Sequence, residues 1–203
     1  VEGINVHAFR KTTGSILARE DKDLKADIVI GVPDSSLSAA IGYAEEAGIP
    51  FETGLIKNRY IGSTFIRPTE QQRMQGMRVR LNAISSVVKD KRVYLVDDSV
   101  VKGFTSRRIC QLLKEAGAKE VHLRIASPML KYPCLYGADS TAQKDLAAFN
   151  YTVDEMEQLF QVDSLRFLSV EDFKKCVPEA SCLACCTGEY PEELQDYKDE
   201  VKE

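Results

Sequence analysis

Three short runs of apolar residues are spaced along the 203-residue chain. They lie in ADIVIGVP (residues 26–33), KRVYLVDD (91–98) and EVHLRIASP (120–128). Apolar residues at successive positions are typical of a strand that is buried on both faces of a sheet, and runs this short cannot span a membrane. The pattern therefore predicts three strands inside a covered sheet.

Segments with apolar residues at helical spacing precede or separate these strands. Residues 5–20 place apolar side chains behind Asn5, which is a candidate helix cap. Residues 36–48 and 107–118 also have a helical pattern, and Gly48 and Gly117 close these two helices. Strands that alternate with helices predict an α/β fold with a mostly parallel sheet and helices on both faces. In such folds ligands bind outside the carboxyl ends of the strands.

The last third of the chain favours helices. Two patterns that resemble capping boxes, at Thr152 and Ser169, each mark a helix start. We therefore expect one large domain over residues 1–150. A helical, cysteine-rich C-terminal extension over residues 151–203 is expected to pack on it.

The charge balance narrows the classes of partner. The chain has 27 basic and 31 acidic residues and a net charge of -4, so it lacks the basic footprint of a nucleic-acid-binding protein. Its N-terminus lacks the basic and then apolar pattern of a signal peptide. We therefore expect a cytoplasmic protein whose main partners are neither nucleic acids nor membranes.

One segment departs from this acidic balance. Residues 52–86 concentrate basic side chains, which are Lys57, Arg59, Arg67, Arg73, Arg78 and Arg80. A cluster of cations in an otherwise acidic chain suits an anionic ligand, whereas the plainer interpretation is a solvated basic face.

The segment VYLVDDSVVKGFTS contains the most distinctive chemistry. The predicted strand ends in the adjacent Asp97 and Asp98, and hydroxyl groups and a glycine follow before the next predicted helix. A helix start offers free N–H donors to a phosphate, and two carboxylates beside it can hold neighbouring ribose hydroxyls directly or through magnesium. The segment thus suits a phosphorylated sugar. The plainer interpretation is a strand end followed by an ordinary helix cap.

This string closely resembles the phosphoribosylpyrophosphate signature of type I phosphoribosyltransferases. Other segments narrow the resemblance to the amidophosphoribosyltransferases. In order, they are GVPDSS, AAIGYAEEAGIP, KNRYIGSTFIRP, VDDSVVKG, AGAKEVHLRIASP, YPCLYG, FLSVE and CLACCTGEYP. They cover nearly the whole chain and are jointly specific. The resemblance implies a type I phosphoribosyltransferase fold.

The site residues of that family carry over to matching positions. The resemblance implies that Asp97 and Asp98 bind the ribose hydroxyls and magnesium, and that Ser35 is a further magnesium-associated position. The family's phosphate loop corresponds to Ser99, Val101, Lys102, Gly103, Thr105 and Ser106. Its mobile loop, which meets the pyrophosphate and acts in catalysis with the acid pair, corresponds to Lys57, Asn58, Arg59 and Tyr60.

The resemblance also implies a reaction. A phosphoribosyl group would pass from phosphoribosylpyrophosphate to ammonia and give 5-phosphoribosylamine, the first step of de novo purine synthesis. A homo-oligomer, purine nucleotides as feedback ligands and an N-terminal glutaminase domain that supplies ammonia are further implications. The chain begins at Val1 and shows no glutaminase residues, so we expect that domain to be absent from it.

Other functions fit parts of the sequence. A salvage or pyrimidine phosphoribosyltransferase shares the acid-pair loop but lacks the cysteine-rich tail. A catalytically weakened regulator that senses phosphoribosylpyrophosphate is favoured by two departures from the family pattern. Ser63 replaces an arginine, and Phe104 occupies a usually small or polar position. Ser36, in place of a glycine, is a third departure. A structural metal module would explain the tail alone.

Four of the six cysteines crowd near the end of the chain, at Cys176, Cys182, Cys185 and Cys186. Disulfide frameworks are typical of small secreted chains, so the crowding favours a metal. The CxxC pair can bind one metal ion or one corner of an iron–sulfur cluster, and zinc remains an alternative.

The resemblance implies a structural [4Fe-4S] cluster, which a subset of the family carries. Its ligands would be Cys134, Cys182, Cys185 and a cysteine that lies before Val1 in the family's order. We therefore expect Cys134 to approach the CxxC pair in space.

Overall fold

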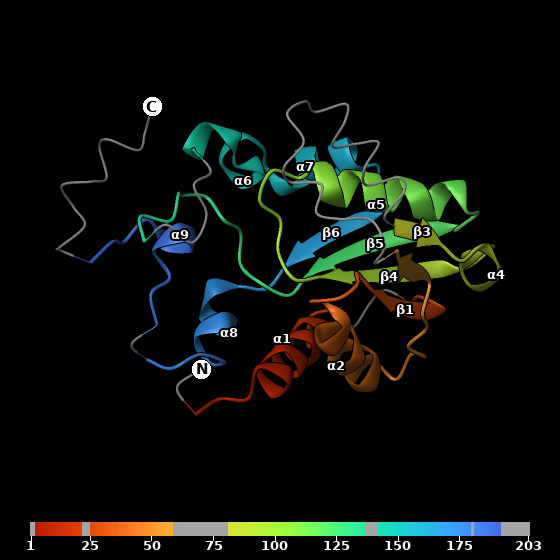
Figure 1. The fold of residues 1–203 in the computed structure, drawn as a ribbon, viewed down its shortest axis with the longest axis horizontal. Helices are drawn as coiled ribbons and strands as arrows, with labels where there is room; N and C mark the ends of the chain where they lie inside the picture. Colours follow the sequence, from red (N-terminus) through yellow and green to blue (C-terminus); the bar gives the residue numbers. More distant parts are fainter. Residues whose placement is uncertain (1–2, 22–24, 59–80, 137–141, 180, 192–203) are drawn as a thin grey trace.

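A four-stranded parallel sheet lies at the centre of the described part of the chain (Figure 1). The computed structural model describes residues 3–21, 25–58, 81–136, 142–179 and 181–191. In spatial order the strands are β1 (Ile28–Gly31), β4 (Arg92–Asp97), β5 (Glu120–Ile125) and β6 (Ser164–Phe167). β4 therefore has a neighbour on each side. The three strands predicted from the apolar runs are confirmed.

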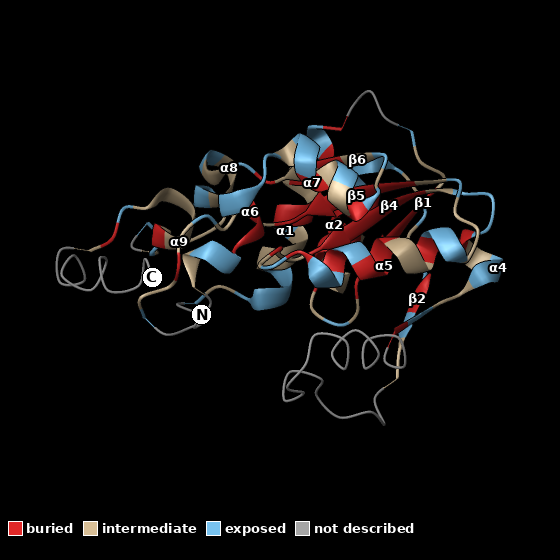
Figure 2. Ribbon diagram, turned by 90° about the horizontal axis from the view of Figure 1, so that it is seen from above, coloured by how far each residue is buried: buried red, intermediate tan, exposed pale blue. Residues whose placement is uncertain are grey.

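Helices cover both faces of this sheet (Figures 1 and 2). They are α1 (Val6–Arg19) and α2 (Leu37–Ala47) on one face, and α5 (Phe104–Glu115) and α7 (Val153–Phe160) on the other. On β4, Val93 and Leu95 belong to the core beneath α5, while Tyr94 and Val96 belong to the core beneath α1 and α2. Successive strand residues point to opposite faces, so burial on both faces explains the continuous apolar runs.

The helix ends follow from side chains that the sequence pattern singled out. The Asn5 side chain accepts a hydrogen bond from the Ala8 N–H at 3.1 Å and so begins α1. α2 ends at Gly48, whose φ of 65° suits glycine. Thr152 and Glu155 form a reciprocal capping box at the start of α7. These predicted helix ends are confirmed.

Two glycines bring α1 and α2 into close contact. A Cβ atom at Gly14 would lie 1.8 Å from the carbonyl oxygen of Ala39, and one at Gly42 would lie 2.0 Å from that of Lys11. A larger residue at either position would therefore force the helices apart. The close contact between α1 and α2 therefore fixes the position of α2, including its start, on this face of the sheet.

The segment after residue 150 contributes to the main body. β6 pairs in parallel with β5, and Met156, Phe160 and Leu165 lie in the same core as α5. The expectation of a purely helical extension missed this strand. Its four residues, SLRF, mix polar and apolar side chains and so lack the apolar signal of the other strands.

Shorter elements complete the described residues. An antiparallel pair, β2 (Leu55–Lys57) with β3 (Leu81–Ala83), stands apart from the main sheet. The short helices are α4 (Ser85–Val88), η2 (Gln143–Asp145), α6 (Ala147–Asn150), α8 (Val170–Lys174) and α9 (Ala184–Thr187). None of the described helices combines the length and hydropathy that crossing a lipid bilayer requires.

A buried ion pair joins β5 to the end of α1. The Arg124 guanidinium is fully buried and donates to both carboxylate oxygens of Asp21. The Tyr43 hydroxyl also donates to Asp21, at 2.6 Å, and Arg166 lies 3.1 Å from it. Burial, followed by the hydrogen bond to Asp21, raises the pKa of Tyr43 above its usual range, so the hydroxyl remains a donor. The Arg124 guanidinium also lies over the Tyr94 ring, at 5.2 Å.

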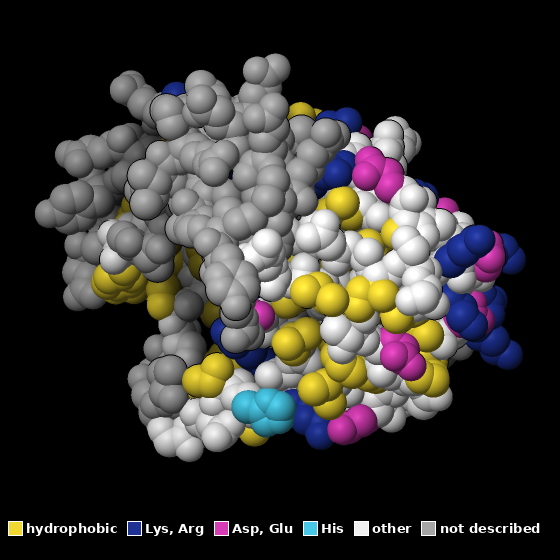
Figure 3. All heavy atoms as spheres, turned by 45° about the vertical axis from the view of Figure 1, so that its right-hand side comes forward, with side chains coloured by type: hydrophobic (Ala, Val, Ile, Leu, Met, Phe, Trp, Pro, Cys, Tyr) yellow, Lys and Arg dark blue, Asp and Glu magenta, His cyan; other side chains and the backbone are white. Residues whose placement is uncertain are grey.

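Surface ion pairs are of a different kind. On the face in Figure 3, cationic and anionic side chains lie side by side at the right-hand edge. Elsewhere on the surface, exposed pairs such as Lys11 with Glu45 and Arg19 with Glu46 link α1 to α2. Solvent and salt screen such pairs, so each contributes little to stability. Loss of Arg124 would instead deprive the buried Asp21 carboxylate of its main partner.

We predict that Arg124→Leu lowers the free energy of unfolding by about 3 kcal/mol, because it removes the main partner of the buried Asp21 carboxylate. Arg107→Leu removes an exposed arginine of α5 and should change stability by less than about 0.5 kcal/mol. Urea unfolding followed by circular dichroism measures both. Equal losses in the two variants would contradict the role of the buried pair.

Candidate functional site

The acid pair lies at the carboxyl end of β4. Asp97 is the last residue of the strand and is only 6% exposed, while Asp98 is partly exposed. Oδ1 of Asp97 accepts two hydrogen bonds, from the Ser36 hydroxyl and from the Asp98 N–H, both at 2.9 Å. The Ser99 hydroxyl donates to Asp98 at 3.4 Å. The pair therefore combines one enclosed carboxylate with one accessible carboxylate.

The electrostatics of this pair favour a cation or a hydroxyl-bearing ligand. Burial, followed by the negative charge of Asp98, raises the pKa of Asp97 to about 7. A divalent cation, or donors that hydrogen-bond to the carboxylates, would relieve this repulsion. Magnesium is commonly held by one or two carboxylates together with the phosphates of a substrate. The residues present therefore fit magnesium when a phosphorylated ligand is also bound.

The loop after the pair leads directly into α5. Gly103 precedes the helix with a φ of 80°, and a Cβ there would lie 2.8 Å from the Phe160 ring. Gly103 has no side chain that could cap α5, and no side chain among the described residues does so, which leaves the N–H groups of the first turn available to an anion. In that first turn Thr105 is exposed and Ser106 is buried, while the Phe104 ring is 49% exposed.

Residues far along the chain brace this loop. The Lys102 ammonium lies 2.8 Å from the Asp145 carboxylate, and the Val101 carbonyl accepts a hydrogen bond from the Ala147 N–H at 2.8 Å. Because Phe160 also packs against Gly103, three points of the loop are supported from outside its own strand and helix. The loop shape thus depends on the segment that follows β5.

The turn after β1 reaches the same edge of the sheet. Lys57 lies 2.8 Å from Asp34, which brings the start of the KNRY string to the PDS turn. Ser35 is partly buried in that turn. Asn58 is the last residue of the string that the structure describes, so the predictions for Arg59 and Tyr60 lie outside the described residues. The described residues nevertheless bring Lys57 and the Asp34–Ser36 turn together at this edge.

The sequence pointed to Ser36 only as a departure from the family pattern and gave it no role in the site. It is fully buried at the start of α2, where a serine ordinarily caps the helix through its hydroxyl. Its hydroxyl instead donates to Asp97, 61 residues away along the chain. Sequence spacing alone offers no signal for this contact.

The segments that contain Cys134 and the CxxC pair lie next to each other. The Cys185 carbonyl accepts hydrogen bonds from the N–H groups of Lys131 and Tyr132, both at 3.0 Å, and the Tyr190 hydroxyl donates to the Pro133 carbonyl at 2.6 Å. Among the described residues, however, no three His, Cys, Asp or Glu side chains are grouped to hold a metal ion. The predicted convergence of the three sulfurs stays a prediction. Cys110 is buried in the core.

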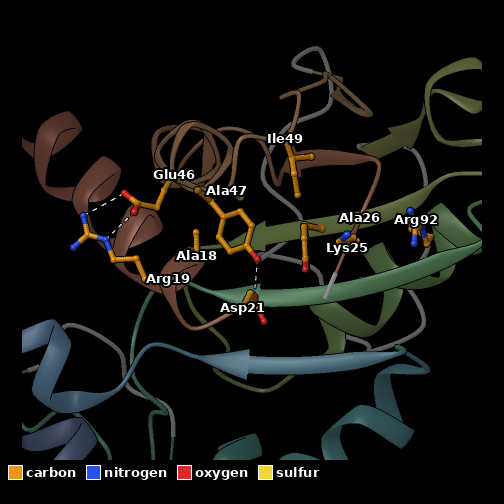
Figure 4. A pocket seen from close by; sticks show the side chains of 11 residues that line it. Ala18, Arg19, Asp21, Lys25, Ala26, Glu46, Ala47, Ile49 and Arg92 are labelled. Atoms are coloured by element: carbon orange, nitrogen blue, oxygen red, sulfur yellow. Dashed lines mark hydrogen bonds and ion pairs between the residues drawn. The ribbon is translucent and has the colours of Figure 1, made fainter. Parts of the chain in front are cut away.

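A separate hollow of about 590 Å³ lies between the ends of α1 and α2 and the start of β4 (Figure 4). Its polar walls are largely engaged with each other, since Arg19 pairs with Glu46 and Tyr43 donates to Asp21. No residue of the acid-pair loop lines it. The chemistry therefore lies with the acid pair and not with this hollow.

Comparison with protein families identifies the domain that carries this site. The model of the phosphoribosyl transferase domain matches residues 6–152, which include the acid pair and the loop after it. The chain belongs to the phosphoribosyltransferase family. The expected fold, a mostly parallel sheet of the type I phosphoribosyltransferases, is confirmed.

Curated proteins that are similar to this phosphoribosyltransferase include amidophosphoribosyltransferases. That of Bacillus subtilis (strain 168) is 51% identical over 208 residues, which cover 99% of this chain and 43% of that protein. That of Archaeoglobus fulgidus is 47% identical over 196 residues, with coverage of 94% and 43%. The chain thus spans less than half the length of these relatives. The resemblance that the motifs indicated is confirmed.

Two solved structures are also similar to this chain. The glutamine phosphoribosylpyrophosphate amidotransferase from B. subtilis complexed with ADP and GMP is 52% identical, with a TM-score of 0.84 over 96% of this chain and 44% of that chain. A structure described as the allosteric regulatory enzyme of purine biosynthesis is 50% identical, with a TM-score of 0.86 over 100% of this chain and 45% of that chain.

We predict that Asp97→Asn stabilises the ligand-free phosphoribosyltransferase at pH 8. The pKa of Asp97 is about 7 in the folded protein and about 4 in an unfolded chain. The folded state therefore binds more protons between these values, and stability falls as pH rises from about 4 to about 7. The variant should remove this slope and gain about 4 kcal/mol at pH 8, because a difference of one pKa unit corresponds to about 1.4 kcal/mol.

Urea unfolding at pH 5 and pH 8 measures this difference. Asp90→Asn, at an exposed turn position, is the matched control and should retain the wild-type slope. If Asp97→Asn and Asp90→Asn have the same pH dependence, burial of the Asp97 carboxyl does not govern it.

Proposed function

We propose that this chain transfers the phosphoribosyl group of phosphoribosylpyrophosphate to ammonia and so forms 5-phosphoribosylamine. One observation carries the proposal: Asp97 ends β4, Asp98 follows it, and the short loop 99–103 leads from this pair to the uncapped start of α5. Carboxylates for ribose hydroxyls and amides for a phosphate therefore stand side by side. The identity of about half of the residues with amidophosphoribosyltransferases supports ammonia as the acceptor.

Each polar part of the substrate has a partner in this arrangement. Asp97 and Asp98 accept hydrogen bonds from the ribose hydroxyls, and the amides that begin α5 bind the 5′-phosphate. Lys57 supplies positive charge for the leaving diphosphate, whose negative charge grows in the transition state. Magnesium, held by the acid pair, would neutralise part of the charge on the diphosphate.

The reaction exchanges one bond for another at the anomeric carbon. The bond to the diphosphate oxygen breaks, and its electron pair leaves with the diphosphate while positive charge builds on the ring oxygen and the anomeric carbon. The lone pair of ammonia forms the new C–N bond, and a proton then leaves the nitrogen. Because ammonia is already nucleophilic, positioning and electrostatic stabilisation do most of the catalysis.

We also propose that the ammonia comes from glutamine hydrolysed by a domain outside this chain. The chain covers 43% of the B. subtilis relative, so most of that relative has no counterpart here. Purine nucleotides are proposed as further ligands, since one similar structure is described as a complex with ADP and GMP. These nucleotides contain a phosphorylated ribose, as does the proposed substrate.

We predict that the purified chain, with magnesium and ammonium salts, releases pyrophosphate from phosphoribosylpyrophosphate. Asp98→Asn should lower kcat/KM about 100-fold, because an electrostatic contact to the reacting group is commonly worth that much. A coupled assay for pyrophosphate measures the rate, and isothermal titration measures the affinity for the substrate. Asp90→Asn, the exposed control, should retain full activity.

Two outcomes would oppose this proposal. Tight binding of phosphoribosylpyrophosphate without pyrophosphate release would favour the regulator, in which catalysis has been lost. If the wild-type chain does not bind phosphoribosylpyrophosphate, the assignment of the acid pair as its binding site is contradicted. Glutamine in place of ammonium should give no release, so glutamine-driven turnover would contradict an external source of ammonia.

We propose separately that Cys134, Cys182 and Cys185 supply three thiolates to an iron–sulfur cluster whose fourth ligand lies outside this chain. Cubane clusters are usually held by four cysteine thiolates, so this donor set fits the chemistry. The hydrogen bonds from the N–H groups of residues 131–132 to the Cys185 carbonyl support the proposal. They hold the segment that leads to Cys134 next to the segment that contains Cys182 and Cys185. Because no three His, Cys, Asp or Glu side chains are grouped to hold a metal ion among the described residues, the proposal expects the three sulfurs to come together when the cluster is bound.

We predict that anaerobic reconstitution with ferrous iron, sulfide and a small thiol gives a protein with a visible charge-transfer band and bound iron. Cys134→Ser, Cys182→Ser and Cys185→Ser should each lose most of the iron, whereas Cys110→Ala, in the core, should retain it. Chemical analysis of iron and acid-labile sulfide measures how much cluster each variant retains. Full retention by Cys134→Ser, or no iron in the wild type, would contradict the proposal.

A further inference from the structure

We infer that Ser36 is a positioning residue that orients the Asp97 carboxylate for the substrate. The inference rests on the proposed function, because it concerns how the acid pair meets phosphoribosylpyrophosphate and magnesium. Ser36 itself touches no reacting atom. It acts through the hydrogen bond from its hydroxyl to Oδ1 of Asp97, which is 2.9 Å long and buried.

The Ser36 hydroxyl is turned away from its ordinary partner. A serine at the cap position before a helix usually accepts a hydrogen bond from an N–H of the first turn. At the start of α2 no such bond is present, and the hydroxyl donates instead to a carboxylate at the end of β4. The Ser36 carbonyl still accepts the Ala40 N–H at 2.9 Å, so the helix begins normally. The side chain therefore serves the acid pair and not the helix.

This contact removes a freedom that a carboxylate otherwise has. Rotation about the bond to a carboxylate is soft, so an aspartate is poorly oriented unless its oxygens are held. Oδ1 of Asp97 receives two donors, the Ser36 hydroxyl and the Asp98 N–H. Both donors act on one oxygen and so fix the plane of the carboxylate. On the proposed function, Oδ2 is the oxygen that accepts from the substrate.

The donor is itself rigidly placed. The Ser36 N–H donates to the Val32 carbonyl at 3.3 Å, and the Val32 N–H donates to the Val96 carbonyl at 3.0 Å. Val96 directly precedes Asp97 in β4. A short chain of backbone contacts therefore links Ser36 to the strand that carries its acceptor. Ser36 has no exposed surface, so water cannot replace the hydroxyl without a change in packing.

The test compares two serine substitutions on the same helix. Ser36→Ala removes the donor and leaves nearly the same volume, and Ser38→Ala removes a hydroxyl that contacts His7 and not the acid pair. We expect Ser36→Ala to raise the dissociation constant for phosphoribosylpyrophosphate with magnesium about tenfold, as loss of a hydrogen bond to a charged group does. The half-saturating magnesium concentration should rise as well. Ser38→Ala should leave both values unchanged.

Unfolding curves and circular dichroism of each variant at the assay temperature separate binding from folding. If Ser36→Ala is folded and binds within twofold of the wild type, the inference is overturned while the proposed function stands. If Ser38→Ala weakens binding as much as Ser36→Ala, the effect belongs to the helix and the inference is also overturned. If the wild-type chain binds no phosphoribosylpyrophosphate, it is the proposed function that fails.

Discussion

The pairing of β4 on both sides is the constraint on which the site depends. β4 lies in register with β1, where Gly31 stands opposite Val96, and with β5, where Asp97 stands opposite Ile125. All of these strands run parallel, so the turns that leave β1 and β4 emerge at the same edge. Ser36 and the acid pair therefore meet although they are far apart in sequence. The hydrogen bond between Ser36 and Asp97 is a consequence of the sheet.

The burial that positions Asp97 also opposes its ionisation. Enclosure and the neighbouring Asp98 raise its pKa, while the Ser36 hydroxyl and the Asp98 N–H lower it and only partly offset that rise. The free protein therefore carries an electrostatic cost at its acid pair. A ligand that brings hydroxyl donors or a cation relieves this cost on binding. Functional sites commonly reduce stability in this way, and the rest of the core compensates.

Local signals account for what the sequence predicted well. The apolar runs mark strands that are covered on both faces, and the caps at Asn5 and Thr152 lie within a few residues of the N–H groups they bind. Contacts between distant residues account for what it missed. β6 is a four-residue strand without an apolar run, and its pairing with β5 defines it. The contact of Ser36 could not be predicted for the same reason. A serine directly before a helix is interpreted as a helix cap unless its distant partner, here Asp97, is known.

The phosphate loop shows why a motif alone does not determine a site. The string after Asp98 supplies the right groups, and the first turn of α5 supplies amides. The loop's path, however, is set by Asp145, Ala147 and Phe160, which contact Lys102, Val101 and Gly103 in turn. Asp145 and Ala147 lie at the end of the domain expected over residues 1–150, whereas Phe160 lies in the extension expected to follow it. Since these three residues brace the loop, the segment that follows β5 forms part of the structural support of the site, and a local motif identifies the chemistry without fixing its geometry.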